Sequence, residues 1–425
     1  MSVETDPQLQ SGALDGSGLR RVVVVLSTVQ ITSWGVLFYA FAALQGSISA
    51  ETGWSSVAVT GAFSLAQLVS GAVGIWVGRH IDDVGPRKVM TAASLVAVPG
   101  VLAVALAPNV GVFYVGWVVV GVAMAGSLYP SAFAALTRWG GTQRVRALTT
   151  LTLVAGLAST VFAPLASVLE DRLGWRGAYL VLLVGLVLIT VPLHWWGLNH
   201  PWRSAHHSHQ DGDGAEGGPL GGLETRAGRR VEARAVTRSR PFLALAAANA
   251  LTSLAVFAVL VNLVPMLVEQ GLSRNTAAVA LGLGGVGQVV GRLGYARFAA
   301  ATSVTSRSVI VLGAVAVATA ALALAPASAG VLVALGMALG LARGIYTLIQ
   351  ATAVTDRWGP AAYGTLNGVL TAPALVAAAA APFAGAALAA LLGSYADAFL
   401  VLAAIAALAA ALMAAATPRH QQAGR

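Results

Sequence analysis

The chain has 425 residues, of which 57% are hydrophobic and only 10% are charged, and its formal net charge is +9. Soluble domains carry about 25% charged residues, so this composition excludes an ordinary soluble protein and favours a polytopic membrane protein. The absence of cysteine excludes disulfides and thiolate metal sites. The basic residues lie in short loops between apolar runs, as membrane topology requires, so the positive charge does not indicate a nucleic-acid partner.

A helix needs about 20 apolar residues to cross a bilayer, and twelve runs of that order follow one another along the chain. The first six are 22–45, 57–77, 89–107, 110–135, 147–169 and 178–197. The second six are 242–268, 276–291, 309–325, 329–354, 361–392 and 398–415. The sequence therefore predicts two six-helix bundles, 22–197 and 242–416, with a linker at 198–241 and tails at 1–21 and 417–425.

An even number of spans places both termini on one side of the membrane. If that side is the cytosol, the outer loops contain only Arg172, Arg176 and Arg274 among the basic residues. Because cytosolic loops carry the excess of Lys and Arg, this asymmetry predicts cytosolic termini in a multi-pass protein of the plasma (inner) membrane.

The predicted linker, 198–241, is Gly-rich and polar, which is typical of a flexible cytosolic segment. It contains His206, His207 and His209. These side chains are able to bind a metal, but a solvated tract is the preferred interpretation because no ordered element presents them. We therefore expect no metal site and no cofactor.

Short motifs recur at nearly constant spacing in the two halves. GIWVGR at 74–79 matches GQVVGR at 287–292 with an offset of 213, and TRWGG at 137–141 matches DRWGP at 356–360 with an offset of 219. Six spans in each half give both copies the same orientation. The pattern predicts parallel repeats related by an axis along the membrane normal.

The stretch GRHIDDVGPRK, from Gly78 to Lys88, resembles the loop signature of the major facilitator superfamily. The residues at the signature positions are Gly78, Asp82, Gly85, Arg87 and Lys88, and Asp83 departs from the usual basic residue. The resemblance covers about residues 20–416. It implies an all-α membrane fold of twelve transmembrane helices in two parallel six-helix repeats, and secondary transport by alternating access.

The resemblance also implies a conformational latch. Asp82 would face the N-terminus of the eleventh span, near 359–363, where a carboxylate meets the positive end of a helix dipole. The alternative is a solvated turn with positive-inside residues. WGVLFYAF (34–41), ETGWS (51–55) and LGWRGAY (173–179) further resemble the branch of monocarboxylate porters and oxalate–formate exchangers.

Arg343 is the one arginine well inside a predicted span. It follows Ala329 by 14 residues, which is about 21 Å along a helix. An isolated arginine near the bilayer centre costs about 2.5–3.5 kcal/mol, so it should face the bundle interior. All sixteen acids fall in termini, loops or span ends. The partner is then a carbonyl, water or an anionic substrate, and guanidinium suits a carboxylate.

Other polar and aromatic residues fall on helix faces that the resemblance assigns to the substrate cavity. On the tenth span Tyr346, Thr347 and Gln350 share the face of Arg343. Helix packing is the alternative role for each of them. The remaining candidates are Gln30, Trp34, Phe38, Tyr129 and Asn249.

The sequence thus predicts a monomeric carrier of a small organic anion such as a monocarboxylate. The coupling ion, if any, is unidentified, and the partners are a small-molecule substrate and the lipid bilayer. Two alternatives stay open. An exporter of apolar or cationic compounds is supported weakly by Ala163-Pro164 in the fifth span, a partial match to an exporter signature. A non-transporting receptor would need a signalling domain. No enzyme is expected, since no nucleophile–base set or phosphate loop is evident.

Overall fold

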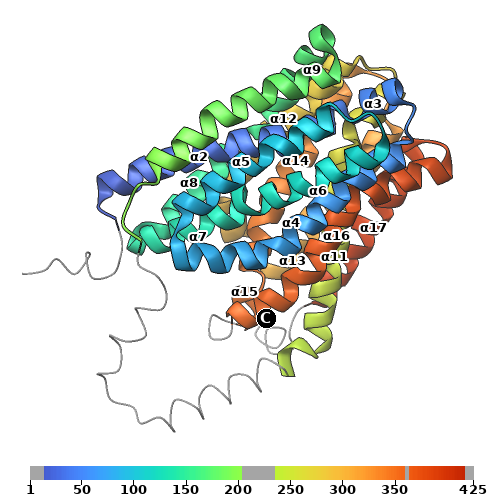
Figure 1. Ribbon diagram of the computed structural model, residues 1–425. Helices are drawn as coiled ribbons and strands as arrows, with labels where there is room; N and C mark the ends of the chain where they lie inside the picture. Colours follow the sequence, from blue (N-terminus) through green and yellow to red (C-terminus); the bar gives the residue numbers. More distant parts are fainter. Residues whose placement is uncertain (1–13, 203–234, 359–362, 417–425) are drawn as a thin grey trace, which may run out of the picture. The chain divides into compact units, whose positions relative to one another are not determined.

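The computed structural model describes residues 14–202, 235–358 and 363–416 (Figure 1). The chain forms two compact units, Met1–Asp213 and Gly214–Arg425. Within the described ranges the regular structure is helical throughout. Outside the described residues lie 1–13 of the predicted tail 1–21, the predicted tail 417–425, and the linker residues 203–234 with all three candidate histidines.

The first span of the N-terminal unit is longer than predicted and is not uniform. Its helix begins at Gly16, six residues before the predicted start, because the Asp15 carboxylate accepts a hydrogen bond from the Gly18 backbone amide. A π-helix, η1 (Gly35–Tyr39), then separates α2 (Gly16–Trp34) from α3 (Ala40–Thr52). Single π turns inside helices occur frequently at functional sites.

The remaining N-terminal helices hold five further spans. The fourth predicted span, 110–135, is broken at Leu128, whose backbone is extended, and Pro130 near the start of the next helix cannot donate a backbone hydrogen bond. Gly174 divides the run Ala158–Gly197 into two helices, because its φ of 68° and ψ of 170° are not helical. The helices are α4 (Ser56–Val84), α5 (Pro86–Ala105), α6 (Val110–Ser127), α7 (Tyr129–Trp139), η2 (Gly141–Gln143), α8 (Arg144–Ala155) and α9 (Ala158–Gly197).

The C-terminal unit repeats this order with fewer interruptions. Serine side chains accept backbone N–H groups at the first turns of several of its helices, with Ser239, Ser273, Ser303 and Ser394 as the N-caps. The helices are α11 (Arg240–Glu269), α12 (Arg274–Ala301), α13 (Val304–Leu324), α14 (Ala329–Thr352), α15 (Thr355–Trp358), α16 (Tyr363–Leu392) and α17 (Tyr395–Ala415).

Eleven helical runs among the described residues are long and apolar enough to cross a membrane. One of them, Arg146–Gly197, has 52 residues and contains the break at Gly174, so it holds the predicted fifth and sixth spans. Large apolar side chains also point outward, such as Leu391 at 82% exposure and Val317 at 70%. A helix that is apolar on its outer face as well as its inner face is typical of a membrane span.

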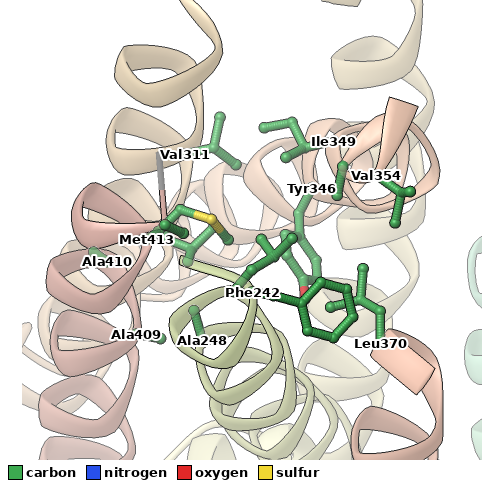
Figure 2. Close-up of a cluster of buried hydrophobic side chains, with 14 of the residues drawn as sticks. Phe242, Ala248, Val311, Tyr346, Ile349, Val354, Leu370, Ala409, Ala410 and Met413 are labelled. Atoms are coloured by element: carbon green, nitrogen blue, oxygen red, sulfur yellow. The ribbon is translucent and has the colours of Figure 1, made fainter. Parts of the chain in front are cut away.

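The two units have different cores. In the N-terminal unit, aromatic rings meet face to face and edge to face: Phe41 stacks on Phe63 at 4.3 Å, and Trp117 meets both rings at 5.1 Å. In the C-terminal unit, a large cluster consists mainly of Ala, Val and Leu with Phe242 and Tyr346 (Figure 2). Nine of the ten tryptophans lie before residue 203, so this difference is already present in the sequence.

Glycine brings α12 and α14 into close contact in the C-terminal unit. Gly336, Gly340 and Gly344 are four residues apart and therefore line one side of α14. A Cβ at Gly340 would overlap the backbone oxygen of Gly284, and a Cβ at Gly344 would overlap that of Gln288. Small residues let helices approach closely in lipid, and here they place Gln288 directly against α14.

Candidate functional site

Arg343 lies inside the C-terminal unit with 8% of its surface exposed. Its Nη2 donates to Oε1 of Gln288 on α12 over 3.1 Å. Its buried Nε has no hydrogen-bond partner among the described residues. The guanidinium therefore lies beside a neutral amide. Gln288 was not among the predicted site residues, because only the glycine contact between α12 and α14 brings it to Arg343.

A small cavity adjoins Arg343. Its lining combines aliphatic side chains with glycines from three helices of the C-terminal unit: Val256, Leu260 and Leu263 of α11, Leu281 and Gly284 of α12, and Gly336, Leu339 and Gly340 of α14. The cavity measures about 20 Å³, which is room for about one water molecule. In this conformation the guanidinium thus adjoins an apolar space too small for an organic solute.

Tyr346 and Asn249, two of the predicted site residues, are in contact. The Tyr346 hydroxyl donates to Asn249 Oδ1 over 2.5 Å, and both residues are buried. Asn249 Nδ2 in turn donates to the Leu370 carbonyl over 3.5 Å. Figure 2 shows Tyr346 among the apolar side chains of the cluster. In this conformation the pair links α11, α14 and α16.

The other two predicted residues of α14 are less buried. Thr347 and Gln350 both retain part of their surface. The Thr347 hydroxyl donates to the Gly344 carbonyl of its own helix over 2.8 Å. The predicted face is thus divided, with Arg343 and Tyr346 buried within the unit and Thr347 and Gln350 only partly covered.

Gln30 is completely buried in the N-terminal unit and forms a hydrogen bond at the break in the fourth span. Its Nε2 donates to the Ser127 carbonyl over 2.7 Å, where α6 ends. In a continuous helix the Ser127 carbonyl would accept from the backbone N–H four residues further on, but the extended backbone at Leu128 ends the helix, so the Gln30 amide supplies a donor. Gln30 Oε1 is buried with no partner among the described residues. One end of this side chain is structural, and the other is free to accept a hydrogen bond.

Aromatic rings form a row beside the same break. Trp34 lies 5.1 Å from Tyr129, and Tyr129 stacks on Phe133 at 5.1 Å. Phe38 lies 5.3 Å from Trp34 and is fully buried, whereas the other three are partly covered. The π-helix of the first span and the break of the fourth span therefore meet at Trp34 and Tyr129. Phe133 belongs to the row and was not predicted.

The loop signature has a defined local structure. Gly85 has φ 87° and ψ 162°, a conformation that is essentially confined to glycine, and Pro86 begins α5. Arg87 Nη1 donates to Asn199 Oδ1 over 2.7 Å, and its guanidinium lies 4.2 Å from the Trp195 ring. Lys88 is exposed, and a Cβ at Gly78 would meet open space.

The predicted latch involves Asp82 and the start of the eleventh span. The side chain of Asp82 and residues 359–362 lie outside the described residues. The latch therefore stays a prediction.

The C-terminal unit carries an ion pair near the end of its tenth span. With the repeat offset of 219, Asp356 corresponds to Thr137 near the end of the fourth span. Arg307 forms an ion pair with Asp356, which also accepts from the Thr352 hydroxyl over 2.9 Å. Burial lowers the pKa of the neighbouring Arg357 to about 10, with Asp356 opposing this shift. Arg357 thus remains charged at neutral pH and donates to the Ala416 carbonyl over 3.1 Å.

Within the ranges that the structure describes, no group of three His, Asp or Glu side chains is placed to hold a metal ion. Duplicated spanning helices and a signature loop define a multi-pass membrane protein of the carrier type. A model of the Major Facilitator Superfamily matches residues 24–326. The chain belongs to this superfamily.

Individual relatives are distant. The chain is 27% identical over 143 residues to an uncharacterised transporter of the same superfamily, YcxA, from Bacillus subtilis. That match covers 32% of this chain and only 34% of the relative.

Solved structures show the same fold over nearly the whole chain. A bacterial homologue of the human lysosomal transporter Spinster, inward-facing and unoccupied, has a TM-score of 0.74 at 14% identity, with 95% of this chain and 98% of that one covered. The nucleoside transporter NupG has a TM-score of 0.70 at 13% identity, with coverage of 94% and 100%. At such low identity these likenesses establish the fold and not the substrate.

Proposed function

We propose that the protein is a secondary active transporter that moves a small organic anion, such as a monocarboxylate, by alternating access. The observation that carries this proposal is Arg343, a buried guanidinium with a neutral amide beside it. Among the described residues no carboxylate lies within ion-pair distance of it. Membership of the superfamily supports transport rather than enzymatic catalysis.

The physical argument concerns the uncompensated charge. An arginine in the hydrocarbon region costs at least about 2.5–3.5 kcal/mol, and Gln288 supplies only one neutral acceptor. A carboxylate binds guanidinium through two parallel N–H···O bonds and neutralises it. The aliphatic side chains beside Arg343, such as Leu260 and Leu339, suit the hydrocarbon part of such a solute. The cavity must widen before the solute enters, as alternating access requires.

The other predicted residues have supporting roles in this proposal. In the C-terminal unit, Tyr346, Thr347, Gln350 and Asn249 would provide hydroxyl and amide groups. In the N-terminal unit, Gln30 would offer its free Oε1, while Trp34, Phe38 and Tyr129 would offer ring faces. We propose a monomer in the plasma membrane with both termini in the cytosol. Its transport would be driven by an ion gradient and would need no cofactor.

One observation favours a different cargo. The row Trp34–Tyr129–Phe133 gathers three partly covered aromatic rings, and aromatic rings attract apolar and cationic compounds. An exporter of those compounds is therefore the second candidate. An apolar or cationic compound would not compensate the charge of Arg343, so we rank the exporter below the anion carrier.

Uptake and efflux across a panel of carboxylates in proteoliposomes test the proposal. Arg343→Ala should reduce carboxylate transport at least tenfold, and Arg343→Lys should restore part of it, because a point charge replaces a bidentate donor. Arg297→Ala is the matched control, since Arg297 is exposed on the neighbouring helix α12. Unchanged carboxylate affinity in Arg343→Ala contradicts the assignment. Thermal stabilisation by lipophilic cations, and none by carboxylates, supports the exporter.

A further inference from the structure

The five residues that follow the sixth span, Leu198–Trp202, are packed against the N-terminal unit rather than forming the start of a free linker. We call this segment the strap. Leu198 is completely buried, and the His200 amide donates to the Leu198 carbonyl over 2.9 Å, which turns the chain. The predicted linker began at 198, so its first five residues belong to the folded unit.

The strap contacts two residues of the loop signature. Asn199 Oδ1 accepts the hydrogen bond from Arg87 Nη1 at 2.7 Å. The indole of Trp202 covers Gly85 so closely that a Cβ at Gly85 would lie 2.9 Å from the ring. The glycine is thus required twice, by its backbone conformation and by the tryptophan above it.

The strap also contacts the end of α7. Trp139 Nε1 donates to the Pro201 carbonyl over 3.1 Å, and its ring meets Trp202 edge to face at 5.4 Å. The Arg138 guanidinium lies 4.9 Å from the Trp202 ring, within the range of a cation–π interaction. A segment of five residues therefore joins the signature loop to the end of the fourth span.

Trp202 reaches between helices as well. It packs against Val77 and Ile81 of α4 and Ala125 of α6. Val77 directly precedes the signature stretch, and Ile81 belongs to the part of that stretch that lies on α4. Trp202 is therefore packed between the second and fourth spans, where removal of the indole would leave a cavity beside Gly85.

We propose that Asn199 and Trp202 are positioning residues for the loop signature, so that the strap couples the central linker to the conformational equilibrium of the carrier. The inference rests on the proposed alternating access. Loss of the indole frees the Gly85 turn and the end of α4, and Asp82 lies on that end. A change in the linker that pulls the strap away would have the same effect.

Single-cysteine labelling tests whether the strap covers α4. The chain has no cysteine, so an introduced thiol is the only target. Ile81→Cys should react slowly with a maleimide, because Ile81 is fully buried, and at least tenfold faster when combined with Trp202→Ala. Val84→Cys is the control, since Val84 is 47% exposed, and its rate should not change. If Ile81→Cys reacts with the maleimide at the same rate with and without Trp202, the claim that the strap covers α4 is wrong.

Pulsed electron paramagnetic resonance tests the coupling between the strap and the conformational equilibrium, and it needs no substrate. Spin labels at Gln143→Cys and Arg297→Cys, both exposed in the native chain, report the distance between the units in the full-length protein. Trp202→Ala should shift this distribution, Trp202→Phe should restore it, and Asn199→Ala should shift it less. In an Asp82→Asn background, Trp202→Ala should not shift the distance distribution any further.

A strap that only stabilises the fold would lower the melting temperature of Trp202→Ala and leave the distance distribution unchanged, which overturns the coupling. Because neither readout involves transport, failure of the carboxylate assay would not mimic this result.

Discussion

The fourth and tenth spans occupy equivalent places in the two repeats, but they pack against their neighbouring helices in different ways. The fourth is broken at Leu128, and Gln30 from another helix satisfies the carbonyl at the break. The tenth, α14, is continuous, and its glycines admit the backbone of α12. The repeat offset places Met124 at the position of Arg343. The comparison indicates that a duplicated scaffold keeps its helix order while each copy acquires its own interior chemistry.

The two units also differ in how arginine side chains are held near the ends of their spans. In the N-terminal unit, Arg87 and Arg138 lie over the rings of Trp195 and Trp202. In the C-terminal unit, Arg307 is paired with Asp356. Rings and an ion pair thus stabilise corresponding regions, and substitutions should distinguish the two units.

Gly340→Ala should have the largest effect. Its methyl group would overlap the backbone oxygen of Gly284, and neither helix backbone can retreat without losing its other contacts. Overpacking of this kind costs about 1–3 kcal/mol, occasionally more. We expect a melting temperature in detergent lowered by several degrees and weakened carboxylate transport. Gly313→Ala on α13 is the control, since open space surrounds Gly313 and alanine favours a helix. Equal stability of both variants would show that α12 and α14 are not in close contact.

Gln30→Leu should be next in size. It removes the donor to the Ser127 carbonyl, and a buried acceptor without a partner costs about 1–3 kcal/mol. The loss should appear in thermal unfolding and in faster hydrogen exchange around residues 124–131. Gln143→Leu, at an exposed position, should change neither. If Gln30→Leu is as stable as the native chain, the break does not depend on this amide.

Asp356→Asn should destabilise the C-terminal unit by about 1–2 kcal/mol, less than a fully buried pair because the Asp356 side chain is 24% exposed. Arg307 would then lack its counter-charge. The double variant Asp356→Asn/Arg307→Gln should recover part of the loss. A simple sum of the two single effects would show that the pair has no coupling energy.

Glu51→Gln should have the smallest effect. Glu51 pairs with Arg176 at 3.2 Å, but the side chains are 54% and 36% exposed, and such pairs contribute about 0–1 kcal/mol. We expect a change in melting temperature at the limit of detection, smaller still in 0.5 M salt. A large loss at low salt would mean that the N-terminal unit depends on charge as much as the C-terminal unit does.

The sequence by itself determined the number and order of the spans, the duplication and the family, because apolar length, charge placement and short motifs are local properties. It also identified Gly85 and the unusual Arg343. It misjudged the continuity of the fourth span, where Leu128 gives no strong signal. The membrane side of each terminus and the latch of Asp82 remain predictions.

The tertiary structure decided the partners. Gln288 is 55 residues from Arg343, and Ser127 is 97 residues from Gln30. Such pairs depend on the rotation and closeness of packed helices, which hydrophobic periodicity leaves open: a polar residue on an inner face meets whichever group the neighbouring backbone brings to it. For the same reason the sequence assigned the strap to the linker. Only the packing of Trp202 against α4, α6 and α7 shows that the folded unit extends to residue 202.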